Sequence, residues 1–114
     1  MSEHAAITVT VCTSCPMGLA GFADTLRDRL AADHKDVVIA TRDCMSGCTR
    51  PSTVAVRSAG KTAYLFGDLT DADAELIDTF LRHYRDSDTG DFEDARVLGD
   101  LRFKAIARIP GQVV

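Results

Sequence analysis

Apolar and polar residues alternate at the start of the chain and then change to a helical spacing. In residues 7–11, three β-branched apolar residues are separated by two threonines, which predicts a strand that ends at Cys12. Pro16 suits the first turn of a helix that follows this strand. We expect the helix to end near Asp33. Its apolar stripe comprises Leu19, Phe22, Ala23, Leu26 and Leu30.

Three further strands and a second helix follow. Residues 37–40 form a continuous apolar run, which predicts a central strand covered on both faces. Residues 53–57 and 62–66 predict two strands joined by a hairpin turn. Thr70 is a suitable N-cap for a second helix with an acidic first turn, which we expect to end near Asp86. The buried stripe of that helix comprises Leu76, Ile77, Phe80, Leu81 and Tyr84.

The order of these elements predicts an α/β fold. Strand, helix, strand, cysteine loop, strand, strand and helix together make a four-stranded mixed sheet with helices packed on it, a thioredoxin-like arrangement. We expect one domain, with residues 1–86 as its body and residues 87–114 as an acidic linker and a basic and apolar C-terminal strap. Phe103 and Ile106 are expected to pack the strap while its basic side chains remain in solvent; a docking patch or an anion site is the alternative for those charges.

Composition narrows the class of protein and its location. The chain has 114 residues, of which 46% are hydrophobic, and this suits a single domain with one core. A net charge of −4 argues against a nucleic-acid binder. With neither a membrane helix nor a signal peptide expected, we predict a cytoplasmic protein without membrane contact. The cytoplasm keeps thiols reduced, so a disulfide framework is disfavoured.

All four cysteines fall into two close pairs, Cys12 with Cys15 and Cys44 with Cys48. Each pair follows one of the first two predicted strands, so parallel pairing of these strands would bring both pairs to one edge of the sheet. Four thiolates suit a tetrahedral zinc site or a 2Fe–2S cluster, and the spacing alone does not separate the two. A third alternative is a dithiol redox site of Cys12 and Cys15 at the start of a helix. The three histidines, which show no ligand spacing and are expected on the surface, are His4, His34 and His83.

The second cysteine pair lies in a longer motif. Cys44-Met-Ser-Gly-Cys48-Thr-Arg-Pro51, followed by a hairpin and then Gly67-Asp-Leu-Thr70, resembles the thioredoxin-like 2Fe–2S ferredoxins and the small iron–sulfur subunit of respiratory NADH dehydrogenases. The resemblance covers residues 5–86. It implies a 2Fe–2S cluster with Cys12 and Cys15 on one iron, Cys44 and Cys48 on the other, and a cis peptide bond at Pro51. The first pair departs from that family, which has four or more residues between its cysteines where this chain has two.

The whole chain, including residues 101–110, also resembles a bacterial family of small predicted metal-binding proteins often encoded near cobalamin-synthesis genes. Together these features predict a one-electron carrier rather than an enzyme, serving as redox partner of a larger oxidoreductase. Only the resemblance to this bacterial family implies a role in cobalamin-related metabolism. A zinc-binding or metal-delivery protein is the alternative, and a thiol–disulfide oxidoreductase using Cys12 and Cys15 is a further one. A homodimer formed through a sheet edge or the strap also stays open.

Overall fold

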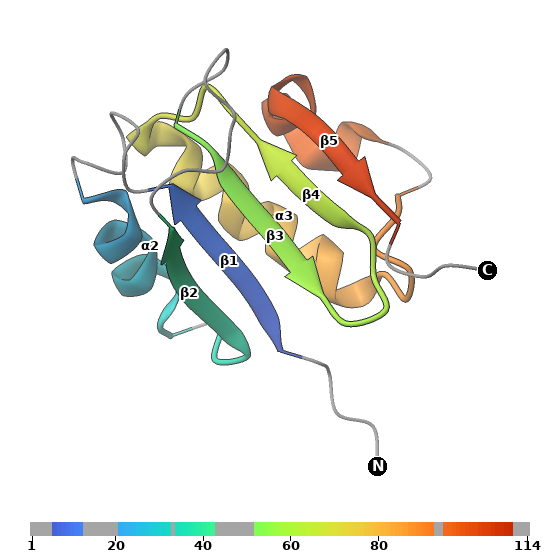
Figure 1. Cartoon of the computed structure of the whole chain (residues 1–114), viewed down its shortest axis with the longest axis horizontal. Helices are drawn as coiled ribbons and strands as arrows, with labels where there is room; N and C mark the ends of the chain where they lie inside the picture. Colours follow the sequence, from blue (N-terminus) through green and yellow to red (C-terminus); the bar gives the residue numbers. More distant parts are fainter. Residues whose placement is uncertain (1–5, 13–20, 33, 43–51, 93–94, 111–114) are drawn as a thin grey trace.

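The computed structural model describes residues 6–12, 21–32, 34–42, 52–92 and 95–110. Its sheet has five strands in the order β2-β1-β3-β4-β5 (Figure 1). These strands are β1 Ile7–Cys12, β2 Val37–Arg42, β3 Val54–Ser58, β4 Ala63–Phe66 and β5 Ala105–Ile109. Strands β1 and β2 pair in parallel, and all other neighbours pair antiparallel. The predicted mixed α/β sheet is confirmed, with one strand more than expected because the C-terminal strap supplies β5.

The helical elements of the described residues pack on one face of this sheet. They are α2 Phe22–Leu30, the 3-10 turn η1 Asp71–Asp73, α3 Ala74–Asp86 and η2 Ala95–Lys104. In Figure 1, α3 runs behind the strands, on the side away from the viewer. Helix α2 begins after Gly21, whose left-handed φ of 90° suits a residue without a Cβ; Pro16 lies outside the described residues.

Helix α3 begins four residues later than Thr70, the predicted N-cap, because η1 comes first. The carboxylate of Asp73 accepts a hydrogen bond of 2.8 Å from the backbone N–H of Thr70, and the N–H of Asp73 donates to the carbonyl of Thr70. These reciprocal bonds satisfy groups that the start of a helix would otherwise leave unpaired. The predicted acidic start is present, but Thr70 opens the 3-10 turn and Asp73 occupies the N-cap.

One hydrophobic core lies between the sheet and the two α-helices. The period of two in β1 directs its three aliphatic residues into this core and leaves the two threonines on the opposite face. Five rings, those of Tyr64, Phe66, Phe80, Tyr84 and Phe92, pack together with centroid distances of 5.1 to 6.1 Å. The remaining large core side chains are Ile7, Val9, Val11, Phe22, Leu26, Leu30, Val54, Val56, Leu69, Ile77, Leu81, Leu98 and Leu101.

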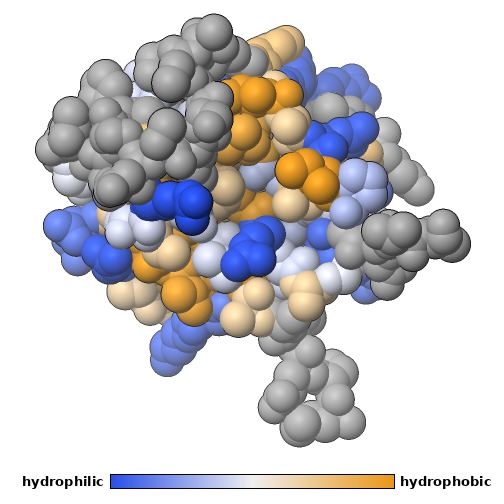
Figure 2. Space-filling view, in the orientation of Figure 1, coloured by the Kyte–Doolittle hydropathy of each residue, from blue (hydrophilic) through white to orange (hydrophobic). Residues whose placement is uncertain are grey.

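The other face of the sheet has no helix over it among the described residues. Figure 2 looks onto this face, where apolar, weakly polar and charged residues are mixed. Strand β2 lies at the edge of the sheet, and Val38 is 53% exposed. The prediction of a central strand covered on both faces is therefore wrong for β2, because an apolar run reveals a strand without revealing its place in the sheet.

The strap packs through residues other than the predicted ones. Leu98 and Leu101 are buried, whereas Phe103 is 66% exposed and Ile106 is 37% exposed. Gly99 has φ 60° and ψ −143° and divides η2 into two helical pieces, and η2 packs against α3. The prediction that Phe103 and Ile106 pack the strap is wrong. None of the helices in the described ranges is long and apolar enough to cross a membrane.

His34 is buried, with 2% of its surface exposed, so the prediction of a surface residue is wrong. Its Nε2 lies 2.6 Å from Oδ1 of Asp78, and its Nδ1 lies 2.8 Å from a guanidinium nitrogen of Arg85. Arginine can only donate, so Nδ1 accepts and the Nε2–H donates to the carboxylate. Arg85 also holds Asp36 through two bonds of 2.5 and 2.7 Å. These contacts, which we call the His34 network, join the start of β2 to α3.

Candidate metal centre

Four strand ends meet at the edge of the sheet that carries Cys12. Cys12 is the last residue of β1 and lies in register with Arg42, the last residue of β2. The N–H of Cys12 donates a 3.1 Å hydrogen bond to the carbonyl of Thr53, immediately before β3. The antiparallel pairing of β3 with β4 brings Phe66, at the end of β4, to the same edge. We call this the Cys12 edge.

The structure describes one of the four predicted ligands. Cys12 is buried, with 1% of its surface exposed. Cys15, Cys44 and Cys48 lie outside the described residues, as does Pro51 with its predicted cis bond. The parallel pairing of the first two strands is confirmed, whereas the convergence of the four sulfurs stays a prediction. Among the described residues, no three His, Cys, Asp or Glu side chains gather as a metal ion would require.

The backbone at the Cys12 edge adopts two unfavourable conformations. Ser52 has φ 62° and Asp68 has φ 56°, values in the left-handed region that non-glycine residues rarely occupy. A hydrogen bond of 3.3 Å from the N–H of Leu69 to the carbonyl of Ser52 joins the two segments. Strain of this kind costs about 1–3 kcal/mol per residue and collects at functional sites. It therefore marks this edge independently of the cysteines.

Thr53 contributes a buried hydroxyl that has no hydrogen-bond partner among the residues that the structure describes. The residue is 1% exposed, and its Oγ1 makes no hydrogen bond to any described residue. Leaving such a group unpaired costs about 1–3 kcal/mol. No sequence motif pointed to Thr53, because its importance depends on its place directly before β3 and beside Cys12. A buried hydroxyl without a described partner is a free donor at this edge, as far as residues 6–12, 21–32, 34–42, 52–92 and 95–110 are concerned.

The strap is attached to the same edge through Lys104. The ammonium group of Lys104 lies 2.5 Å from Oδ2 of Asp73 and 3.0 Å from the carbonyl oxygen of Asp68. The backbone N–H of Gly67 donates to the carbonyl of Lys104 at 2.8 Å. The carboxylate of Asp73 is almost completely buried, so its pairing with a cation offsets the cost of removing it from water. Lys104 thus holds the turn at Asp68 in two ways, through its ammonium group on the carbonyl of Asp68 and through its own carbonyl on the N–H of Gly67.

A solved structure shares this fold. It is the structure of a thioredoxin-like [2Fe-2S] ferredoxin from Aquifex aeolicus, which is 18% identical in sequence and superimposes with a TM-score of 0.64. The match covers 96% of this chain and 99% of the ferredoxin. At that identity the likeness shows a thioredoxin-like fold and carries no residue roles with it. No curated protein matches the chain in sequence.

A protein family covers almost the whole chain. The family described as "Protein of unknown function (DUF1636)" matches residues 9–111. The match spans β1 to β5, and it therefore includes the strap as well as the four cysteines. The chain belongs to this family.

Proposed function

We propose that the protein is a one-electron carrier that binds a 2Fe–2S cluster through Cys12, Cys15, Cys44 and Cys48. The observation that carries the proposal is the parallel, in-register pairing of Cys12 with Arg42 at the Cys12 edge. Both cysteine loops start from these two neighbouring strand ends. Ligands in α/β folds bind at the carboxyl ends of parallel strands, where loops of this kind leave the sheet.

Covalent reach supports a shared site. Neighbouring strands lie about 4.8 Å apart, and an extended chain spans at most about 3.6 Å per residue. Cys15 is three residues beyond Cys12, so its Cα lies within about 11 Å of that residue. Cys44 is two residues beyond Arg42, which limits the corresponding distance to about 7 Å. The first cysteine of each pair is therefore held near the same edge by its strand, and each partner is held near it by a short loop.

The donor chemistry of the Cys12 edge fits an iron–sulfur cluster. Four thiolates are the ligands that a 2Fe–2S cluster takes, two on each iron. The hydroxyl of Thr53, buried beside Cys12 without a described partner, would donate to a cluster sulfide or a cysteine sulfur. Hydrogen bonds to sulfur raise the reduction potential of a cluster, because they stabilise its more negative reduced form.

When bound, the cluster supplies the one-electron chemistry, and the chain supplies its binding and environment. Cys12 is held by β1 and by its N–H bond to the carbonyl of Thr53, so the sheet itself fixes the position of this ligand. We infer that the protein is an electron carrier rather than an enzyme, and that its redox partner is a larger oxidoreductase. A link to cobalamin-related metabolism rests only on the gene neighbourhood of the family resemblance described above.

The spacing of the first pair favours a second candidate. Cys12 and Cys15 are separated by two residues, a gap common in tetrathiolate zinc sites. A zinc-binding or metal-delivery protein is therefore the competing proposal. The same spacing suits a thiol–disulfide oxidoreductase, in which Cys12 and Cys15 would act without the second pair.

Metal content and disulfide reductase activity separate the three candidates. Protein purified without oxygen should be red-brown, absorb in the visible range and contain iron and sulfide. A colourless protein with one zinc per chain would support the zinc proposal and overturn the cluster. A metal-free protein that reduces disulfides, and that loses this activity in Cys12→Ser but not in Cys48→Ser, would overturn both metal proposals.

A further inference from the structure

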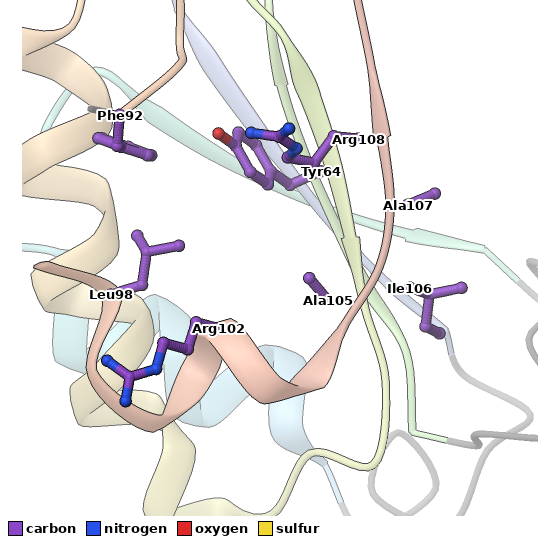
Figure 3. A pocket seen from close by; sticks show the side chains of 8 residues that line it. All are labelled: Tyr64, Phe92, Leu98, Arg102, Ala105, Ile106, Ala107 and Arg108. Carbon is purple, nitrogen blue, oxygen red and sulfur yellow. The ribbon is translucent and has the colours of Figure 1, made fainter. Parts of the chain in front are cut away.

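A cavity of about 440 Å³ opens beside the strap, two strands across the sheet from Cys12. It lies between η2, β5, the neighbouring β4 and the turn that follows α3 (Figure 3). Pockets that hold small organic ligands have about this volume. The residues that line the cavity are Tyr64, Phe92, Leu98, Arg102, Ala105, Ile106, Ala107 and Arg108.

The interior of the cavity is apolar. Figure 3 shows the side chains of Leu98 and Ala105 directed into it and the ring of Phe92 at its far side, whereas Ile106 and Ala107 point away. Leu98 is almost completely buried, and Phe92 packs on the aromatic cluster at 5.8 Å from Phe80 and 6.1 Å from Tyr64. Leu98 belongs to the hydrophobic core and Phe92 and Ala105 pack against it, so a planar or branched hydrocarbon would bury apolar surface here.

The charged groups at the rim are basic. Arg108 lies beside Tyr64, its partner in the β4–β5 register, and Figure 3 shows its guanidinium next to the tyrosine side chain. Arg102 stands on η2, where its guanidinium also packs on the ring of Phe103 at 4.5 Å. Among the described residues, no carboxylate comes within ion-pair distance of either arginine. Figure 3 shows the Arg102 side chain turned away from the cavity, so the positive charge beside Tyr64 comes from Arg108. In a protein of net charge −4, an arginine at such a cavity favours an anion.

Tyr64 fixes the polar end of the cavity. Its hydroxyl donates a 2.7 Å bond to the carbonyl of Gly90, which leaves the oxygen available as an acceptor. Burial raises the pKa of Tyr64, and the charge of Asp91 acts in the same direction, whereas the guanidinium of Arg108 beside it acts in the opposite direction. The phenol therefore stays neutral at physiological pH.

We propose that this cavity binds a small amphipathic organic anion, with an apolar body between Leu98, Phe92 and Ala105 and a carboxylate or phosphate group on Arg108. The guanidinium fork matches either oxyanion through two hydrogen bonds. The site adjoins β4 and β5, whereas Cys12 ends β1 and is separated from β4 by β3. Ligand binding is thus a property independent of the proposed cluster.

The test uses three probes that share one apolar body: 1-naphthoate, 1-naphthyl phosphate and the neutral 1-naphthalenemethanol. Their affinities for the purified full-length chain are measured by calorimetry, and amide NMR shifts locate the probe. At least one anion should bind tenfold or more tightly than the alcohol, because a charge-assisted bond is lost in the neutral compound. The tighter of the two anions identifies the headgroup. The shifts should fall on β5, η2 and residues 87–92.

Arg108→Gln should remove at least nine-tenths of the anion's advantage, and Arg57→Gln, at an exposed arginine of β3, should leave it unchanged. Ala105→Leu should weaken all three probes by filling the cavity. Equal affinity for the alcohol and both anions, shifts confined to another surface, equal losses in the two arginine variants, or no anion binding at 10 mM would each overturn the proposal. None of these outcomes depends on the metal, so they leave the proposed electron carrier untouched.

Discussion

Replacing His34 by leucine should destabilise the protein strongly, although the histidine lies in no motif. The imidazole is completely buried between α3 and the loop that leads to β2. His34→Leu removes the bond to Asp78 and the bond to Arg85, both of which involve a charged partner. It leaves Asp78 with Arg82 at 3.2 Å and Arg85 with Asp36, so neither charge becomes isolated.

The expected loss of stability in His34→Leu follows from these contacts. A hydrogen bond to a charged group contributes about 1.5–3 kcal/mol, and two are lost. The leucine side chain recovers part of this by burying apolar surface, for which about 1.5–3 kcal/mol is typical. We expect the free energy of unfolding to fall by about 2–3 kcal/mol, which for a domain of this size corresponds to a decrease in Tm of about 10–20 °C.

Urea unfolding monitored by circular dichroism measures this change, and His83→Leu provides the matched control. His83 is exposed on the same helix α3, so its replacement should change the free energy of unfolding by less than about 0.5 kcal/mol. If the two variants were equally stable, the buried position and the two charged partners of His34 would be refuted. A change in the urea m-value would instead point to an altered unfolded state.

The carboxylates of the His34 network add a dependence on pH. The hydrogen bond from Arg85 holds the pKa of Asp36 below its usual value. Burial acts to raise the pKa of Asp78, but the bond from His34 and the nearby arginines outweigh it and lower the pKa. Both groups thus contribute stability that is present above about pH 4 and is lost as the pH falls through their depressed folded-state values. His34→Leu should lose less stability than the natural protein between pH 4 and pH 2; an equal or steeper loss would contradict this assignment.

Three further changes test other parts of the structure. Gly90→Ala should lower the free energy of unfolding by at least about 2 kcal/mol, because a Cβ there would lie 2.8 Å from a backbone nitrogen. Gly21→Ala, with open space around the new Cβ, should lower it by about 1 kcal/mol. Equal losses of the two variants in urea unfolding would contradict the packing of Gly90. Lys61→Met should cost about 1–2 kcal/mol, because the ammonium caps the last carbonyls of α3 at 2.7 and 3.1 Å, and Lys35→Met should be neutral in the same assay. Thr53→Val should lower the reduction potential of the cluster-loaded protein by roughly 40 mV in a dye-mediated titration, equivalent to about 1 kcal/mol for one electron. Thr53→Ser keeps a hydroxyl and should keep the original potential. An unchanged potential in the valine variant would show that the hydroxyl makes no hydrogen bond to the cluster.

Local patterns predicted the strands and helices because their signals lie in adjacent residues. The alternation in residues 7–11 became β1, and the hairpin between β3 and β4 formed where the turn sequence required it. Strand β5 was not predicted. The register of its pairing with β4 shifts between Leu65 and Phe66, and Gly99 interrupts η2, the element that precedes it. Neither a helical period nor a strand period survives such a shift.

Properties that depend on distant parts of the chain could not be read from spacing. The apolar run of β2 indicated a strand, but its edge position depends on which strands pair elsewhere. His34 is buried because Asp78 and Arg85 neutralise its polar atoms, and these partners are 44 and 51 residues away. The four cysteines were recognised from their pairing in sequence alone, whereas Thr53 and the cavity at β5 emerged only with the fold.

Electron paramagnetic resonance of the dithionite-reduced protein, combined with iron and sulfide analysis, tests the iron–sulfur assignment most directly. We predict about two irons and two sulfides per chain, a spin-half signal on one-electron reduction, and loss or alteration of that signal in the Ser variants of Cys12, Cys15, Cys44 and Cys48. A normal signal in all four variants, or reduced protein that contains zinc and gives no signal, would contradict it.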